Sequence, residues 1–401
     1  MTATATTGAA TASHPPLARR VARARSSEIR DLLRVTEQPH VLSLAGGLPA
    51  PESLPRARIQ VALARVLEAH GPTGPTALQY GPTEGLDDLR TLLAAGTAGS
   101  PALAPGHDVL VTTGSQQAIG LVVRALVDPG ATVVVEDPLY LGTLQVIEAS
   151  GATLAPIPVD DDGLDVDRLA DQLADGLRPA LVVVVPNHSN PSGVTLAAER
   201  RRGLAGLATH YGFVILEDDA YHGLGFTGAP PAPVSAFAPD HTVTLGSASK
   251  MIAPGLRIGW LGAPRWLAPT LTLLKQSFDL HTSTLDQLLV ADVLHDQVFL
   301  RAHLDAVRTR NAMRAHTLCD ALAGVVDVRP PEGGMFCWGT APVATRPALG
   351  RAMDAGVAYV PGDAFTVACD GRRSLRLSFA TLGPDDLVIA AERLRAVLTT
   401  A

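Results

Sequence analysis

Short apolar runs, rich in β-branched residues, alternate with helical stretches over roughly residues 50 to 285. The runs are apolar at successive positions, which predicts strands that are buried on both faces. Such strands, separated by helices, indicate an α/β fold with a mostly parallel sheet between two layers of helices. The predicted strands cover residues 109–112, 132–135, 181–185, 213–216 and 242–245, with a further strand at 260–262.

The pattern changes after residue 285. Long helices are predicted over 284–323, followed by a smaller α+β unit. Its predicted strands cover 325–328, 335–338, 357–360 and 375–379, and its helices cover 346–355 and 384–398. We therefore expect a mobile tail at 1–22, an N-terminal segment at 23–50 that joins the small domain, a large domain at 51–285 and a small C-terminal domain at 286–401. Further helices are predicted to begin at 26, 56 and 86.

Composition and charge narrow the class of protein. The 401 residues are 47% apolar and 18% charged, which is typical of a globular protein with two domains. The net charge of -7 and the lack of a basic run argue against nucleic-acid binding. The three cysteines form no CxxC motif, no run is apolar enough to cross a membrane, and the first residues do not resemble a secretory signal. These features favour a cytoplasmic location, with no metal site.

Each of the first five predicted strands is followed at once by a polar turn. The turns are TGSQQ at 113–117, EDPLY at 136–140, PNHSNPSG at 186–193, EDDAY at 217–221 and GSASK at 246–250. In a parallel sheet the carboxyl ends of the strands lie at one edge, where ligands bind. We therefore expect these five turns to converge on one site.

The residues of these turns fit a phosphorylated aldehyde. Ser115 and Gln116 lie where a helix begins, and free backbone N–H groups there suit a phosphate. Lys250 is the one lysine in the five turns, and a lysine beside phosphate donors can condense with an aldehyde. Arg257 adds a fork of donors for phosphate oxygens, and Ser247 and Ser249 add hydroxyl groups.

Four other positions suit a planar, nitrogen-containing ring. Asp218 ends a buried strand, where a carboxylate is costly unless it meets a cation such as a ring N–H. Tyr140 offers a ring for stacking, and Asn190 and Tyr221 offer hydrogen bonds. Each feature alone has an ordinary explanation, such as a helix cap, an ion pair, a turn or a solvated lysine. The coincidence of all five turns is what indicates a site.

With these motifs in view, the chain resembles the fold-type I pyridoxal-phosphate (PLP) enzymes of the class I and II aminotransferase group. It is most similar to the branch that contains 2-aminoadipate, kynurenine and aromatic aminotransferases. The resemblance covers residues 27–398, nearly the whole chain. The matching motifs are SLAGGLP at 43–49, LQYGPTEG at 78–85, NPSG at 190–193, DDAY at 218–221, SASK at 247–250, PGLRIG at 254–259 and LRLSF at 375–379.

The resemblance implies a role for each matching residue. Lys250 would form the Schiff base with PLP and move the substrate α-proton, and Asp218 would hold the ring nitrogen. The substrate carboxylate would be bound by Arg376, beside Asn190 and Gly47. The remaining implied cofactor contacts are stacking by Tyr140, phenolic-oxygen contacts by Asn190 and Tyr221, and phosphate contacts by Ser115, Gln116, Ser247, Ser249, Arg257 and, from the partner chain of a homodimer, Tyr80.

Two departures from the family pattern concern the surroundings of the cofactor. His188 and Ser189 stand where an aromatic residue and Gln are common, and Ala248 replaces an aromatic residue. His188 is expected either at the cofactor edge or as an ordinary loop histidine. The departures leave the cofactor chemistry intact and bear on the substrate pocket, so the sequence does not identify the amino acid.

Transamination between an amino acid and a 2-oxo acid, with 2-oxoglutarate as the expected acceptor, is the function that the motifs favour. An alternative is another PLP reaction on the same fold, namely elimination or cyclisation. A PLP-binding regulator is a second alternative, but no helix-turn-helix pattern precedes the resemblance. A dinucleotide-dependent dehydrogenase is disfavoured because no GxGxxG motif follows the first strand.

Overall fold

An eight-stranded sheet forms the centre of the large domain in the computed structural model, which describes residues 40–68 and 76–399. Its strand order is β2-β9-β8-β7-β6-β3-β4-β5, and the steps between β8, β7, β6, β3 and β4 are all parallel. The strands are β2 (His107–Thr112), β3 (Thr132–Asp137), β4 (Thr153–Asp160), β5 (Gly163–Leu164), β6 (Leu181–Val184), β7 (Val214–Asp218), β8 (Thr242–Ser247) and β9 (Gly259–Pro264).

Strand β9 runs antiparallel to both of its neighbours, β2 and β8. Two antiparallel steps restore the direction, so β2 points the same way as β8. The first residue of β9, Gly259, therefore lies beside the last residues of its neighbours, pairing with Thr112 and Ser247. This arrangement brings Arg257, two residues before β9, to the same sheet edge as the five turns.

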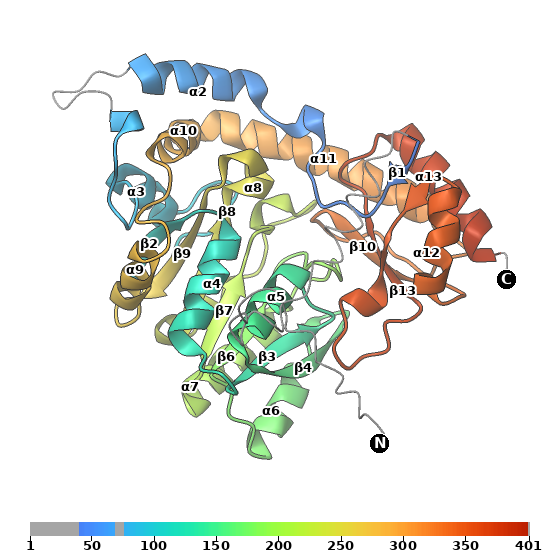
Figure 1. Ribbon diagram of the computed structural model, residues 1–401, viewed down its shortest axis with the longest axis horizontal. Helices are drawn as coiled ribbons and strands as arrows, with labels where there is room; N and C mark the ends of the chain where they lie inside the picture. The colour runs from blue at the N-terminus through green and yellow to red at the C-terminus, as the bar shows by residue number, and fades with distance from the viewer. Residues whose placement is uncertain (1–39, 69–75, 400–401) are drawn as a thin grey trace, which may run out of the picture.

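Helices cover both faces of the sheet, as Figure 1 shows. Successive strand residues alternate between two cores: Val133 and Leu181 pack with α4, α5 and α9 on one face, and Val134 and Val182 pack with α6 and α7 on the other. The strands are thus buried on both faces, which confirms the prediction from the uninterrupted apolar runs. Burial of each such apolar side chain contributes roughly 1.5–3 kcal/mol to stability. The helices of this domain are α2 (Arg56–Glu68), α3 (Asp87–Ala95), α4 (Ser115–Leu126), α5 (Leu141–Ser150), α6 (Val166–Ala174), α7 (Ala198–Tyr211), α8 (Ala248–Met251), α9 (Ala268–Gln276) and α10 (Thr284–His295).

The smaller unit has its own core and lies beside the sheet (Figure 1). The long helix α11 runs along one side of both, with its first half packed in the core of the large domain and its second half in the core of the smaller unit. A three-stranded antiparallel sheet of order β10-β13-β12 packs against α11, α12 and α13, and β1 pairs with β11. The elements are β1 (Leu42–Ser43), α11 (Gln297–Leu322), β10 (Phe336–Thr340), α12 (Thr345–Asp354), β11 (Val357–Ala358), β12 (Val360–Pro361), β13 (Ser374–Ser378) and α13 (Pro384–Thr399).

Four local expectations need correction or fall outside the described residues. The predicted strand at 325–328 is wrong, because only one bridge forms there, between Asp327 and Thr340. The predicted strand at 357–360 is divided into β11 and β12, which belong to different sheets. The tail at 1–22 and the helix start at 26 lie outside the described residues. Over 40–68 and 76–399, no helix is both long and apolar enough to cross a membrane.

Candidate active site

A cleft of about 280 Å³ opens at the sheet edge where the five turns meet. The turns contribute to it together with the segment before β9, the strands β10 and β13, and residues 47–48. Every site residue predicted from the sequence lines the cleft except Tyr80. The lining residues are Gly47, Leu48, Ser115, Gln116, Tyr140, Val185, Asn190, Asp218, Ala220, Tyr221, Ser247, Ser249, Lys250, Pro254, Arg257, Phe336 and Arg376.

Lys250 lies in the short helix α8, directly after β8. The side chain of Ser247 caps this helix by accepting a hydrogen bond from the backbone of Ser249. Lys250 Nζ donates to the carbonyl oxygen of Gly47 at 3.0 Å. Burial, reinforced by the positive charges of Arg376 and Arg257, lowers the pKa of Lys250 to about 8. An amine with this pKa is available as a base or nucleophile near neutral pH.

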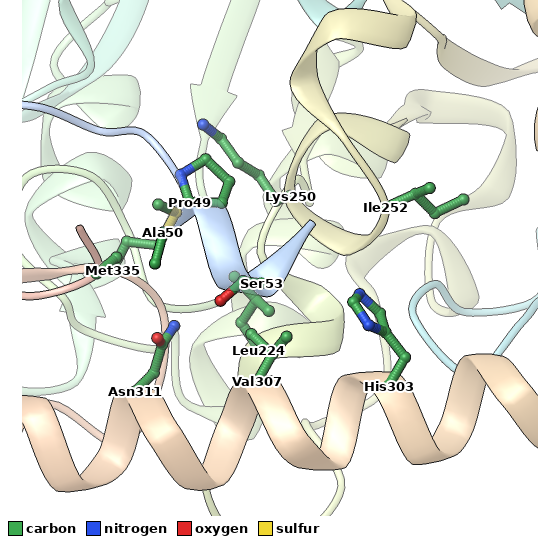
Figure 2. Close-up of a pocket in the computed structure, with 11 residues that line it drawn as sticks. Pro49, Ala50, Ser53, Leu224, Lys250, Ile252, His303, Val307, Asn311 and Met335 are labelled. Atoms are coloured by element: carbon green, nitrogen blue, oxygen red, sulfur yellow. The ribbon is translucent and has the colours of Figure 1, made fainter. Parts of the chain in front are cut away.

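The stem of Lys250 also borders a second, smaller pocket toward α11, shown in Figure 2. Its lining is mainly apolar and includes Pro49, Leu224 and Val307. In Figure 2 the Lys250 nitrogen points away from α11. The reactive end of the side chain therefore belongs to the cleft, and the small pocket encloses its stem.

Asp218 is the last residue of β7 and is buried at the base of the cleft. Its Oδ1 atom has no hydrogen-bond partner among the described residues. Burial, followed by the charge of Asp219, raises the pKa of Asp218 to about 7. A buried carboxylate with an unsatisfied oxygen lacks a cationic donor, and a protonated ring nitrogen in the cleft would supply one.

The turn at 113–117 meets Arg257 at another side of the cleft. Gly114 has φ +82° and caps α4, and an added Cβ would lie 2.2 Å from Arg257 Nη2. The Nε2 atom of Gln116 donates to the carbonyl oxygen of Gly142, which ties α4 to α5. The side chain of Gln116 is therefore engaged with α5, which leaves its backbone N–H, with that of Ser115, as the helix-terminal donor for an anion.

Arg376 extends from β13 and is fully buried beside the cleft. Its guanidinium donates from Nη1 to Asn190 Oδ1 at 2.9 Å and from Nη2 to the carbonyl oxygen of Ala45 at 2.6 Å, whereas Nε has no partner among the described residues. The group lies over the ring of Phe336, 4.3 Å from its centroid. Burial lowers the pKa of Arg376 to about 10, so it remains a cation at neutral pH.

Two tyrosines flank these groups. Tyr140 stands immediately before α5, and burial, followed by the charge of Asp218, raises its pKa. Burial also raises the pKa of Tyr221, which shares a hydrogen bond with Asn190. Both phenols are therefore neutral at physiological pH and can donate hydrogen bonds.

Tyr80 lies away from the cleft of its own chain. It is 77% exposed, and its ring packs edge-on against His281, with 5.5 Å between the ring centroids. The structure thus leaves this side chain free for a contact outside the described chain.

The comparisons with known proteins agree with this geometry. A family model, aminotransferase class I and II, matches residues 53–394. The chain belongs to this family. It is 37% identical to aromatic-amino-acid aminotransferase 1 of Thermococcus litoralis over 91% of this chain and 89% of that protein. Two solved structures are 34% identical and cover 95% of this chain. One is the Pyrococcus horikoshii kynurenine aminotransferase in complex with PMP (TM-score 0.89, 96% of that chain), and the other is the Thermus thermophilus alpha-aminoadipate aminotransferase (TM-score 0.85, 97%).

This class I and II aminotransferase is a PLP-dependent enzyme that acts on an amino acid and a 2-oxo acid. Its cleft fits the cofactor on three observations. The unpaired Asp218 oxygen suits the ring nitrogen, and the Gly114 turn with Arg257 suits the phosphate. The third observation is an amine with lowered pKa, Lys250, which lines the same cleft as both.

Other groups at the aminotransferase site were missed by sequence reasoning. Phe336 lines the cleft and holds the Arg376 guanidinium, but within its strand it looked like an ordinary core residue. Glu136, within the second turn, is buried next to the site, and burial raises its pKa to about 8. Its position at a strand end was the signal that could have identified it.

His188 does not line the cleft. Its ring packs under the 333–334 loop, where a Cβ added to Gly333 would lie 2.5 Å from it, and its Nδ1 lies 3.2 Å from Thr195 Oγ1. Burial lowers the pKa of His188 to about 4, so it is neutral. Of the two expectations, the structure supports the ordinary loop histidine. Ala248 is buried in the apolar core.

Proposed function

We propose that Lys250 is the residue that carries PLP and that its released amine moves the substrate α-proton during transamination. When bound, PLP supplies an aldehyde that condenses with amines and a ring that accepts an electron pair. The observation that carries the proposal is the placement of Lys250, Asp218 and Arg376 around one cleft. The lowered pKa of Lys250 supports the role of the base.

The roles of the surrounding residues follow from their chemistry. Asp218 would keep the ring nitrogen protonated, because its buried carboxylate lacks another cationic donor. The neutral phenol of Tyr221, with the amide of Asn190, would hold the phenolic oxygen of the ring. Tyr140 would stack on the ring, and Ser115, Gln116, Ser247, Ser249 and Arg257 would hold the phosphate.

Arg376 would bind the substrate carboxylate. Its fixed guanidinium presents two parallel donors, a geometry that matches a carboxylate. The unpaired Nε supports this role, since a carboxylate would satisfy it. Asn190 already contacts Arg376 and would adjust with it, and Gly47 would leave room at the mouth of the cleft because an added Cβ would meet Phe336 at 3.0 Å.

For the substrates, we propose an aromatic, 2-aminoadipate-like or kynurenine-like amino donor and 2-oxoglutarate as acceptor. The support is the similarity to relatives with those names. A donor screen followed by cofactor absorbance tests this proposal. Turnover with these donors and 2-oxoglutarate supports it, whereas turnover confined to basic or branched-chain donors contradicts it.

We further propose a cytoplasmic homodimer in which Tyr80 reaches the phosphate of the partner subunit. Tyr80 is largely exposed, and tyrosine is enriched at protein interfaces because it combines a large apolar ring with a polar hydroxyl group. Other large apolar side chains are exposed on the same and neighbouring segments, including Leu78, Phe278 and Leu280. These side chains support an interface around Tyr80.

Spectroscopy distinguishes transamination from elimination or cyclisation. With an amino donor alone, the amine form of the cofactor should accumulate in stoichiometric amount, and a 2-oxo acid should restore the aldehyde form. A cofactor that never reaches its amine form with any turned-over donor would refute transamination. Lys250→Ala is the matched control, because it keeps the cleft and removes the amine.

A further inference from the structure

A buried lysine, Lys275, lies in α9 outside the cleft. Its side chain is 0% exposed, and its Nζ forms an ion pair with Asp279 at 2.7 Å. Among residues 40–68 and 76–399, Asp279 is the one carboxylate within ion-pair distance of Lys275. A buried ammonium group is costly unless it is paired, so the pair is expected to fix the chain between α9 and Asp279.

Asp279 also accepts two hydrogen bonds from the turn at 113–117. Thr113 Oγ1 and Gln117 Nε2 each donate to Asp279 Oδ2 at 2.7 Å. Gln117 Oε1 in turn accepts from the backbone N–H of Thr113 at 2.8 Å. The two residues that bracket Gly114, Ser115 and Gln116 are therefore held to each other and to a single carboxylate.

The negative charge of Asp279 is unfavourable next to a site for an anion. It sits behind a turn whose helix-terminal N–H groups and neighbouring Arg257 suit an anion, and a bare negative charge there would oppose anion binding. Burial alone would raise the pKa of Asp279, but the hydrogen bonds from Lys275, Gln117 and Thr113 hold it below its usual range. Lys275 thus supplies the charge that lets a carboxylate act as the anchor.

We propose that Asp279, neutralised by Lys275, is a positioning residue that fixes the 113–117 turn for the cofactor phosphate. The assignment rests on the proposed function, in which Ser115 and Gln116 bind that phosphate. Asp279 does not line the cleft, so it acts on cofactor affinity through Thr113 and Gln117. The ring chemistry at Lys250 is separate from it.

Equilibrium dialysis of PLP against the apoprotein tests this role directly. Asp279→Ala removes the acceptor of both hydrogen bonds, and we expect the Kd for PLP to rise about tenfold or more, because hydrogen bonds to charged groups are the stronger class. Lys275→Met leaves the Asp279 carboxylate without its cation and should also weaken PLP binding. Added salt should reduce this loss of affinity, because it screens the repulsion between Asp279 and the phosphate. The double variant Lys275→Met/Asp279→Asn keeps a neutral acceptor and should bind PLP within about threefold of wild type.

The thermal midpoint of each apoprotein and kcat at saturating PLP complete the test. A lower midpoint for Asp279→Ala with an unchanged Kd would show a merely structural role and overturn the proposal. A fall in kcat at saturating PLP with an unchanged Kd would also overturn it, since the effect would then reach the ring chemistry. If wild type itself fails to bind PLP, the proposed function fails, and that result is separate from either outcome.

Discussion

Replacing Asp218 with Asn should raise the stability of the apoprotein and lower activity. The carboxylate is buried with one oxygen unpaired, and its pKa rises from 3.8 to about 7. A rise of this size corresponds to roughly 4 kcal/mol of ionisation cost above pH 7, at 1.36 kcal/mol per pH unit. Water that enters the open cleft reduces this ceiling, so we expect Asn to raise the free energy of unfolding by about 1–3 kcal/mol.

The stability that Asp218→Asn gains over wild type depends on pH. Below pH 4 the carboxyl group of Asp218 is protonated in both the folded and the unfolded chain, so Asn gains nothing. Between pH 4 and 7 the folded wild type keeps a proton that the unfolded chain has lost, and wild-type stability falls as pH rises. The advantage of Asp218→Asn should therefore grow across this window and level off above pH 7.

Urea denaturation of both apoproteins at several pH values measures this stability difference. With PLP bound, the same substitution removes the charge opposite the ring nitrogen, and kcat should fall about 10²-fold or more. Equal or lower stability of the variant at pH 8 would refute the inference that the buried, incompletely paired carboxylate of Asp218 destabilises the apoprotein. Unchanged kcat would refute the assignment of Asp218 to the ring nitrogen.

Three further substitutions test other parts of the site. Arg376→Lys replaces the two-donor fork with a point charge, so KM for the amino donor should rise about tenfold or more. The thermal midpoint should fall as well, because a single ammonium group cannot keep the buried hydrogen bonds to both Asn190 and Ala45. An unchanged KM would contradict the carboxylate role. Burial raises the pKa of Glu136 to about 8. Glu136→Gln should therefore raise the thermal midpoint of the apoprotein, by an amount that grows from about pH 4.5 to 8. A difference in thermal midpoint between variant and wild type that does not change with pH would contradict this. Tyr80→Ala mixed with an equal amount of Lys250→Ala should recover about a quarter of wild-type activity, since random dimers then carry one complete site in four. No recovery after subunit exchange would contradict a Tyr80 contribution across the interface.

The sequence predicted most of the cleft because order along the chain and position at the sheet edge are linked. Residues directly after β2, β3, β6, β7 and β8 must meet, whatever the details of packing. Arg257 was predicted from its residue type, but its geometry depends on β9 running antiparallel, which pairs Gly259 with both Thr112 and Ser247. A buried strand has the same apolar pattern in either direction, so the sequence did not predict that β9 is antiparallel to its neighbours.

Groups that act through tertiary contacts were beyond sequence reasoning. Asp279 and Thr113 are 166 residues apart, and no local spacing links them. The division of the run at 357–360 arose because Tyr359 separates residues that pair with different partners. His188 required the structure as well, because only the fold shows that its ring packs against the 333–334 loop and does not line the cleft.

The most direct test of the central claim uses the fact that the sequence contains only two lysines, Lys250 and Lys275. Reduction of the PLP-loaded enzyme with borohydride should fix the cofactor covalently to its lysine, and peptide mass mapping should then identify that lysine. The account predicts one phosphopyridoxyl group per chain, on Lys250, which an excess of amino donor added before reduction removes. A label on Lys275, or a label on Lys250 that an amino donor never displaces, would contradict the account.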